Sequence, residues 1–244
     1  MRAAGIRLAI SANAFWHCQF WRSYMDYAAA RRNMVESQVR PNDVTDRRIQ
    51  DAMARIPRER FLPKSKQPLA YMDDNIAIGE GRILMEPRCF AKMLQAAEVK
   101  ETDVVLDIGC GTGYSTAVLA ALASVVVALE SEDTLVDMAS EILTDMAVDN
   151  AAVVTGPLEQ GCSDQSPFDM IFVNGSVEVI PQIIFDQLSE GGRLVAVVVV
   201  GQNSHARIYN KTGHDGEMYV SSRVIFDAKI PVLTGFQRAA KFVF

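Results

Sequence analysis

A glycine-rich segment in the middle of the chain carries the strongest chemical signal. Asp107 is followed by glycines at alternate positions, Gly109, Gly111 and Gly113. Glycines let the backbone turn tightly and let a ligand come close to main-chain N–H groups. The segment follows a predicted buried strand and opens a predicted helix, whose N-terminus supplies partial positive charge. This arrangement favours the binding of a polar cofactor.

An acidic residue closes the next predicted strand. Glu130 lies 17 residues beyond Gly113, where a carboxylate can accept hydrogen bonds from both hydroxyls of a ribose. The glycines are spaced Gly-x-Gly-x-Gly, unlike the Gly-x-Gly-x-x-Gly of dinucleotide-binding proteins. The sequence also has no Tyr-x-x-x-Lys and no well-placed histidine for hydride chemistry. A nicotinamide dinucleotide is therefore the poorer interpretation of this site.

Composition and charge argue against several other kinds of site. The cysteines form no Cys-x-x-Cys pair and none lies at metal-ligand spacing from a histidine, so we expect neither a zinc site nor a disulfide framework. The net charge of −6 makes nucleic acid an unexpected partner. No uninterrupted apolar run approaches the roughly 20 residues that cross a bilayer. We therefore predict a cytoplasmic protein with reduced thiols and no membrane partner.

Apolar strands and helices alternate through the second half of the chain. Short, fully apolar strands between helices indicate a parallel sheet that is covered on both faces. After Gly201 the pattern changes to antiparallel strands that close the edge of the sheet. The strands are predicted at 103–108, 125–130, 151–155, 169–174, 193–200, 205–209, 218–226 and 241–244, and the helices at 114–123, 133–148 and 179–188.

The N-terminal part is predicted to be mainly helical. Within 26–62 an apolar face at helical spacing precedes Pro57, which ends the helix, and Thr45 or Asp46 is a candidate N-cap. Residues 63–87 are rich in proline and glycine and are expected to form a loop with short extended pieces, before a helix at 88–98.

The domain boundaries follow from these patterns. We expect residues 25–98 to supply helices and a substrate-side loop, and to form one domain with the cofactor-binding α/β core at 99–244. Residues 1–24 do not fit this pattern and make a poor signal peptide. They are interpreted as an over-long start, with a membrane or partner anchor as the alternative.

Several segments resemble the protein-L-isoaspartate O-methyltransferase family. Residues 54–63, Ala-Arg-Ile-Pro-Arg-Glu-Arg-Phe-Leu-Pro, are similar to that family's Val-Pro-Arg-Glu-x-Phe-Val-Pro signature. The resemblance runs from about residue 34 to the C-terminus, with further matches at 34–38, 70–87, 106–113, 168–173 and 188–195.

The resemblance implies a fold and a reaction. The fold is α/β, a Rossmann-like class I methyltransferase with a mainly parallel seven-stranded sheet flanked by helices and an N-terminal helical extension. The family methylates the free α-carboxylate of isoaspartyl residues in damaged proteins. Because a carboxylate is deprotonated at pH 7, this transfer needs alignment and exclusion of water but no general base. The implied partners are a damaged protein or peptide, or a small-molecule acceptor.

The resemblance also implies which residues form the site. S-adenosyl-L-methionine is the implied cofactor, and its expected binding residues are Asp107, Gly109, Gly111, Gly113, Glu130, Pro157 and Leu158.

The sequence departs from the family pattern at two places. Ile83 and Met85 stand where the family has the threonine and serine of Thr-Ile-Ser-Gln-Pro, so a substrate position and the catalytic position lose hydroxyls. Pro157 stands where the family has the aspartate of Gly-Asp-Gly, and losing that acceptor for the adenine amino group costs about 1.5–3 kcal/mol. Asn174 and Ser176, near a strand end, are further candidate substrate contacts, with a polar loop end as the alternative.

Two other functions stay open at this point. A more apolar pocket around Ile83 and Met85 suits a methyltransferase with a less charged acceptor. Loss of the hydroxyls and of the adenine acid would also suit a protein that binds the cofactor without turnover.

Overall fold

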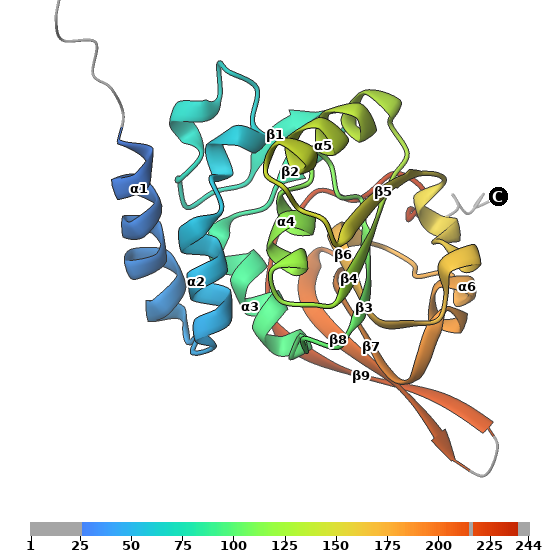
Figure 1. The fold of residues 1–244 in the computed structure, drawn as a ribbon. Helices are drawn as coiled ribbons and strands as arrows, with labels where there is room; N and C mark the ends of the chain where they lie inside the picture. The colour runs from blue at the N-terminus through green and yellow to red at the C-terminus, as the bar shows by residue number, and fades with distance from the viewer. Residues whose placement is uncertain (1–25, 215–216, 239–244) are drawn as a thin grey trace, which may run out of the picture.

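A seven-stranded sheet organises the structure, a computed structural model that describes residues 26–214 and 217–238 (Figure 1). The strand order is β5-β4-β3-β6-β7-β8-β9. The first five strands in this order run parallel, and β8 and β9 are antiparallel at one edge. The predicted α/β class and mainly parallel seven-stranded sheet are confirmed. The strands are β3 (Val104–Ile108), β4 (Val125–Glu130), β5 (Ala151–Thr155), β6 (Phe168–Val177), β7 (Leu188–Val200), β8 (Asn203–His214) and β9 (Glu217–Asp227).

Helices cover both faces of this sheet and complete two hydrophobic cores (Figure 1). Side chains of adjacent strand residues point to opposite faces, so Val105 joins the core under α2–α5 and Leu106 joins the core on the α6 side. The helices are α1 (Tyr27–Met34), α2 (Arg47–Arg55), α3 (Pro87–Ala97), α4 (Tyr114–Ala120), α5 (Asp133–Asp145) and α6 (Gln182–Asp186).

The N-terminal helices pack onto the sheet. Buried side chains of α2, Ile49 and Met53, belong to the same core as the sheet residue Phe172. Asp46 is the N-cap of α2, because its carboxylate accepts the backbone N–H of Arg48 at 2.9 Å. Helix α2 ends at Arg55, before Pro57, as predicted. No helix in the part of the chain that the structure describes is long and apolar enough to cross a membrane.

A small antiparallel hairpin lies between α2 and α3 in the sequence. Strands β1 (Ile76–Gly79) and β2 (Arg82–Leu84) pair only with each other, as a two-stranded sheet. These are the short extended pieces predicted within 63–87. The rest of that stretch contains turns and a short 3₁₀ helix at Gln67–Leu69, and another 3₁₀ helix at Arg58–Phe61 precedes it.

The region around α6 differs from the prediction. A helix was expected at 179–188, but α6 covers only Gln182–Asp186 and β7 already begins at Leu188. Gly191 and Gly192 were expected to precede the strand, but they lie inside β7. The register moves from Phe168↔Leu188 to Met170↔Arg193, so β7 carries three more residues than β6 there. Gly191 adopts a φ of +75°, and this freedom lets the strand bulge without ending.

Two predictions concern segments outside the described residues. These are the strand at 241–244 and the interpretation of residues 1–24.

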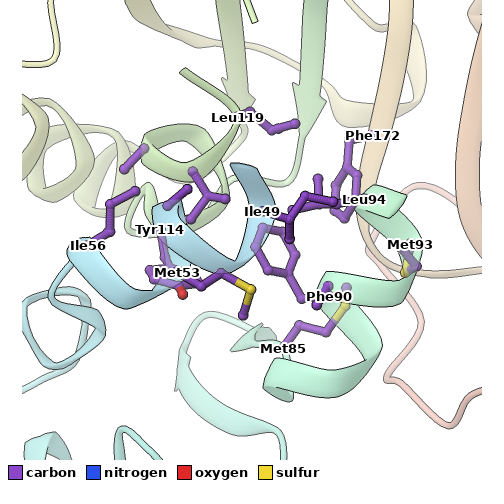
Figure 2. Close-up of a cluster of buried hydrophobic side chains, with 14 of the residues drawn as sticks. Ile49, Met53, Ile56, Met85, Phe90, Met93, Leu94, Tyr114, Leu119 and Phe172 are labelled. Atoms are coloured by element: carbon purple, nitrogen blue, oxygen red, sulfur yellow. The ribbon is translucent and has the colours of Figure 1, made fainter. Parts of the chain in front are cut away.

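The aromatic side chain of Phe90 links α3 to the sheet and to α4 (Figure 2). It is 1% exposed, and its ring centroid lies 5.6 Å from that of Tyr114 and 5.5 Å from that of Phe172. We expect Phe90→Ala to lower the free energy of unfolding by about 3–5 kcal/mol in urea denaturation, because a buried ring is replaced by a cavity. Met138→Ala on α5, where the side chain is 37% exposed, is the control. Equal effects of the two variants would contradict the packing described.

Candidate cofactor site and acceptor groove

The Asp107 carboxylate is the centre of a buried hydrogen-bond cluster. One oxygen accepts the hydroxyls of Ser115 and Thr116, both at 2.7 Å, and the other accepts the side-chain amide of Asn174. Asp107 is fully buried. Its partners belong to α4 and β6, so this carboxylate joins the strand before the glycine loop to the helix after it and to the neighbouring strand.

Burial changes the acidity of this carboxyl. Desolvation raises the pKa of Asp107 to about 6. The hydrogen bonds from Thr116, Ser115 and Asn174 lower this pKa, and the nearby charge of Glu130 raises it slightly. The ionised form is therefore tolerated in the core only because three donors surround it.

Glu130 lies at the same edge of the sheet as the glycine loop and is fully buried. Arg82, from the small hairpin, holds it with Nη2 2.8 Å from Oε1 and Nε 3.1 Å from both carboxylate oxygens. The backbone N–H of Gly111 donates to Oε2 at 3.0 Å, and that of Ser131 donates to Oε1 at 2.7 Å. The carboxylate predicted to accept ribose hydroxyls is thus satisfied by the protein itself.

The glycine loop is covered by side chains from distant segments. All residues from 109 to 113 are buried, and the three glycines have positive φ angles. A Cβ at Gly111 would lie 2.6 Å from Cδ1 of Ile78, and one at Gly109 would lie 3.3 Å from the side chain of Leu233. The loop has the conformation that the sequence predicts, but Ile78 and Leu233 fill the space over it.

A nucleoside cofactor does not fit this arrangement. Its ribose would need acceptor positions on Glu130 that Arg82 now occupies, and its approach to Gly111 would meet Ile78. The donor set is suitable, since loop amides and a strand-end acid come together as predicted. The obstacle is therefore the position of the β1–β2 hairpin and not the chemistry of the loop.

The predicted adenine-side residues lie beside this site. The backbone N–H of Gly156 donates to the carbonyl of Glu130 at 3.0 Å, which places Pro157 next to the acid. Leu158 is buried, with Cδ1 3.7 Å from a Cβ built at Gly109. The structure thus brings Pro157 and Leu158 to the edge where Glu130 and the loop meet.

The four residues predicted on the substrate side lie in different surroundings. Met85 is 4% exposed, and its side chain lies in the core beside Phe90 and Met53 (Figure 2). Ile83 is half-buried and packs against the same core. Asn174 donates to Asp107, and the Ser176 hydroxyl donates to the carbonyl of Ile230 at 2.8 Å. The structure does not gather these side chains around one cavity, and both polar ones have partners within the protein.

A groove of about 720 Å³ lies next to the Met85–Pro87 segment. Its walls are tied together, because Asn75 accepts the backbone N–H of Glu86 at 2.9 Å and donates to the carbonyl of Lys229 at 3.2 Å. Charged side chains of both signs line it beside His205: Asp74, Glu86, Arg88, Asp227 and Lys229. The sequence prediction missed this groove, because its walls come from three distant segments and carry no motif.

The buried Asp107 carboxyl makes stability depend on pH. It is protonated in both states below about pH 3.8, whereas between 3.8 and about 6 only the unfolded chain ionises. The stability that it contributes is therefore present at low pH and lost as the pH rises through 6, by up to about 3 kcal/mol. We expect the stability of Asp107→Asn relative to the wild type to rise by up to this amount between pH 4 and 7 in urea denaturation.

The exposed Asp133 at the start of α5 supplies the matched control. Asp133→Asn removes one carboxylate from the surface, and the same pH dependence in both variants would contradict the role of burial.

Comparison with known proteins identifies the family. The family model described as Protein-L-isoaspartate(D-aspartate) O-methyltransferase matches residues 29–232. Among curated relatives, protein-L-isoaspartate O-methyltransferases are 40% identical in Koribacter versatilis, over 70% of this chain and 78% of that protein, and 33% identical in Roseiflexus sp., over 86% and 95%.

Solved structures agree with this match. A protein-L-isoaspartate O-methyltransferase superposes with a TM-score of 0.74 at 25% identity, over 84% of this chain and 66% of that one. A putative Plasmodium falciparum enzyme in complex with S-adenosyl-L-homocysteine has the same fold, with a TM-score of 0.70 at 21% identity, over 84% of this chain and 98% of that one. The chain that carries this glycine loop, strand-end acid and groove belongs to the protein-L-isoaspartate(D-aspartate) O-methyltransferase family.

Proposed function

We propose that this protein methylates the free carboxylate of isoaspartyl residues in damaged proteins and uses S-adenosyl-L-methionine as the methyl donor. The family match over residues 29–232 carries this proposal, because that range contains the glycine loop, Glu130 and all the residues that line the groove. The relatives named above have this activity in their names, and one solved relative holds S-adenosyl-L-homocysteine.

The groove suits a peptide acceptor. It has a volume of about 720 Å³ and presents Arg88 and Lys229 as cations. Arg88 pairs with Glu86 at 2.8 Å and His205 with Asp227 at 2.7 Å, whereas Lys229 is an exposed cation on the groove wall. A carboxylate acceptor is already ionised at neutral pH, so the protein's task is to align it and exclude water. The chemistry accordingly needs no histidine base.

A protein or peptide partner also agrees with the charge of the chain. At a net charge of −6, a nucleic-acid backbone is repelled unless a basic patch offsets it. We propose a cytoplasmic repair enzyme without a nucleic-acid or membrane partner.

One observation favours a second candidate acceptor. Met85 and Ile83 stand where the family has hydroxyls, and the Met85 side chain is buried in the core. A methyltransferase of this fold with a less charged acceptor would not need those hydroxyls.

Methyl transfer to paired peptides tests the proposal. We expect base-labile incorporation of labelled methyl from S-adenosyl-L-methionine into an isoaspartyl peptide but not into its aspartyl twin, because an ester formed on the free carboxylate hydrolyses readily. Absence of isoaspartate-dependent incorporation, with cofactor binding verified on the same sample, would rule out repair and favour another acceptor.

Lys229→Met tests the groove. We expect KM for the isoaspartyl peptide to rise about tenfold with little change in kcat, because a cation near the bound carboxylate is lost. Lys100→Met is the matched control. It makes the same change of charge just before β3, at the amino ends of the parallel strands, whereas the groove lies beyond the carboxyl end of β7. Equal KM values for the two variants would place the acceptor elsewhere.

A further inference from the structure

The contact between the β1–β2 hairpin and the cofactor acid has a regulatory consequence. We propose that Arg82 closes the cofactor site by occupying Glu130, so that S-adenosyl-L-methionine and its product bind only when the hairpin moves away. This inference rests on the proposed function, since it concerns the same cofactor. It makes Arg82 a residue that lowers the apparent affinity of the enzyme for its cofactor.

The hairpin is built to direct Arg82 inward. Inward-facing positions alternate along its strands, and those occupied by Ile76, Ile78 and Leu84 are apolar. Arg82 occupies the remaining inward position, directly after the two-residue loop Glu80–Gly81. Both loop residues have positive φ, 49° and 71°, as a type I′ turn requires. The turn therefore fixes the register that aims the guanidinium at Glu130.

The closed contact is complete without any outside partner. The guanidinium contacts both oxygens of Glu130 and donates to the hydroxyl of Ser131 at 2.8 Å. The side chains of Arg82 and Glu130 are 1% and 0% exposed. A fork-shaped guanidinium satisfies a carboxylate well in this geometry, and a buried ion pair persists only when its hydrogen bonds are made. The closed state is thus a well-defined structure.

Closure and cofactor binding need the same atoms. A ribose would donate its hydroxyls to the oxygens that Arg82 now holds. Ile78 lies over the α-carbon of Gly111, where a Cβ would come within 2.6 Å of its Cδ1. If the closed state predominates, the apparent dissociation constant equals the intrinsic one divided by the open fraction. A hundredfold preference for closure therefore weakens binding about a hundredfold.

Movement of the hairpin leaves the main sheet paired but exposes the side chains of Ile76, Ile78 and Leu84, which belong to the core. Strands β1 and β2 pair with each other and with no strand of the seven-stranded sheet. At the base of the hairpin, Asn75 reaches the carbonyl of Lys229 at 3.2 Å and the backbone N–H of Glu86 at 2.9 Å, and all three residues line the acceptor groove. Movement of the hairpin would therefore also shift Asn75 and with it the wall of the groove.

Calorimetric titration of the full chain with S-adenosyl-L-homocysteine tests the closing contact. We expect Arg82→Gln to bind at least tenfold more tightly than the wild type, because the closed state loses its ion pair. Ile78→Ala, which loosens the cover over Gly111 and leaves all charges in place, should also bind more tightly. Arg193→Gln is the matched control, because it breaks another buried ion pair, with Asp103, remote from the loop.

The outcomes separate this inference from the proposed function. Equal or weaker binding by Arg82→Gln, with measurable binding by the wild type, overturns the closing contact and leaves the function standing. Absence of binding by both proteins overturns both. Tighter binding by Arg193→Gln to the same degree also overturns it, since general loosening would then explain the gain. If Arg82→Gln does not fold, Ile78→Ala decides, and an affinity equal to that of the wild type overturns the contact.

Discussion

The buried carboxylate of Asp107 is the interaction on which the site depends. It lies one residue before the end of the central strand β3 and accepts hydrogen bonds from the following helix and the adjacent strand, so the backbone between them must turn within a few residues. Only glycines can adopt the left-handed conformations of that turn at no cost. These hydrogen bonds offset part of the cost of burying the acid, and they give the loop one defined geometry.

The second buried carboxylate at this edge of the sheet, Glu130, is stabilised in a different way from Asp107. Its charge is balanced by an arginine and not by neutral donors alone. A buried ion pair is costly to desolvate and is stable only when all its hydrogen bonds are made. Such an acid can therefore exchange one partner for another, provided that each partner satisfies its hydrogen bonds. The neutral donors around Asp107 have no competitor of that kind, so its contacts are structural, whereas the proposed closing contact requires Arg82 to be an exchangeable partner of Glu130.

The groove next to Met85–Pro87 shows how the fold combines distant segments. Its walls come from the chain around β1, from the start of α3 and from the β7–β8 and β9 ends. Asn75 hydrogen-bonds to two of these segments, so it fixes the groove next to the hairpin that covers the loop. The hairpin that covers the glycine loop is therefore flanked in the sequence by residues that line the groove, Asn75 and Glu86.

The sequence by itself determined the order of strands and helices, the glycine loop, the acid at the end of β4 and the family. These features are encoded locally, in apolar runs, glycine spacing and short motifs. It also indicated that Asn174 lies near a strand end as a candidate substrate contact, but not that its amide binds Asp107.

Only the tertiary structure decided what occupies Glu130, where Met85 lies and which residues form the groove. Arg82 is 48 residues from Glu130 in the sequence, and nothing in the spacing of the two predicts that they meet. The length of α6 was decided in the same way, because pairing of β7 with β6 takes Leu188 into the strand. Contacts between distant segments depend on how side chains pack in three dimensions, and no local sequence pattern predicts that packing.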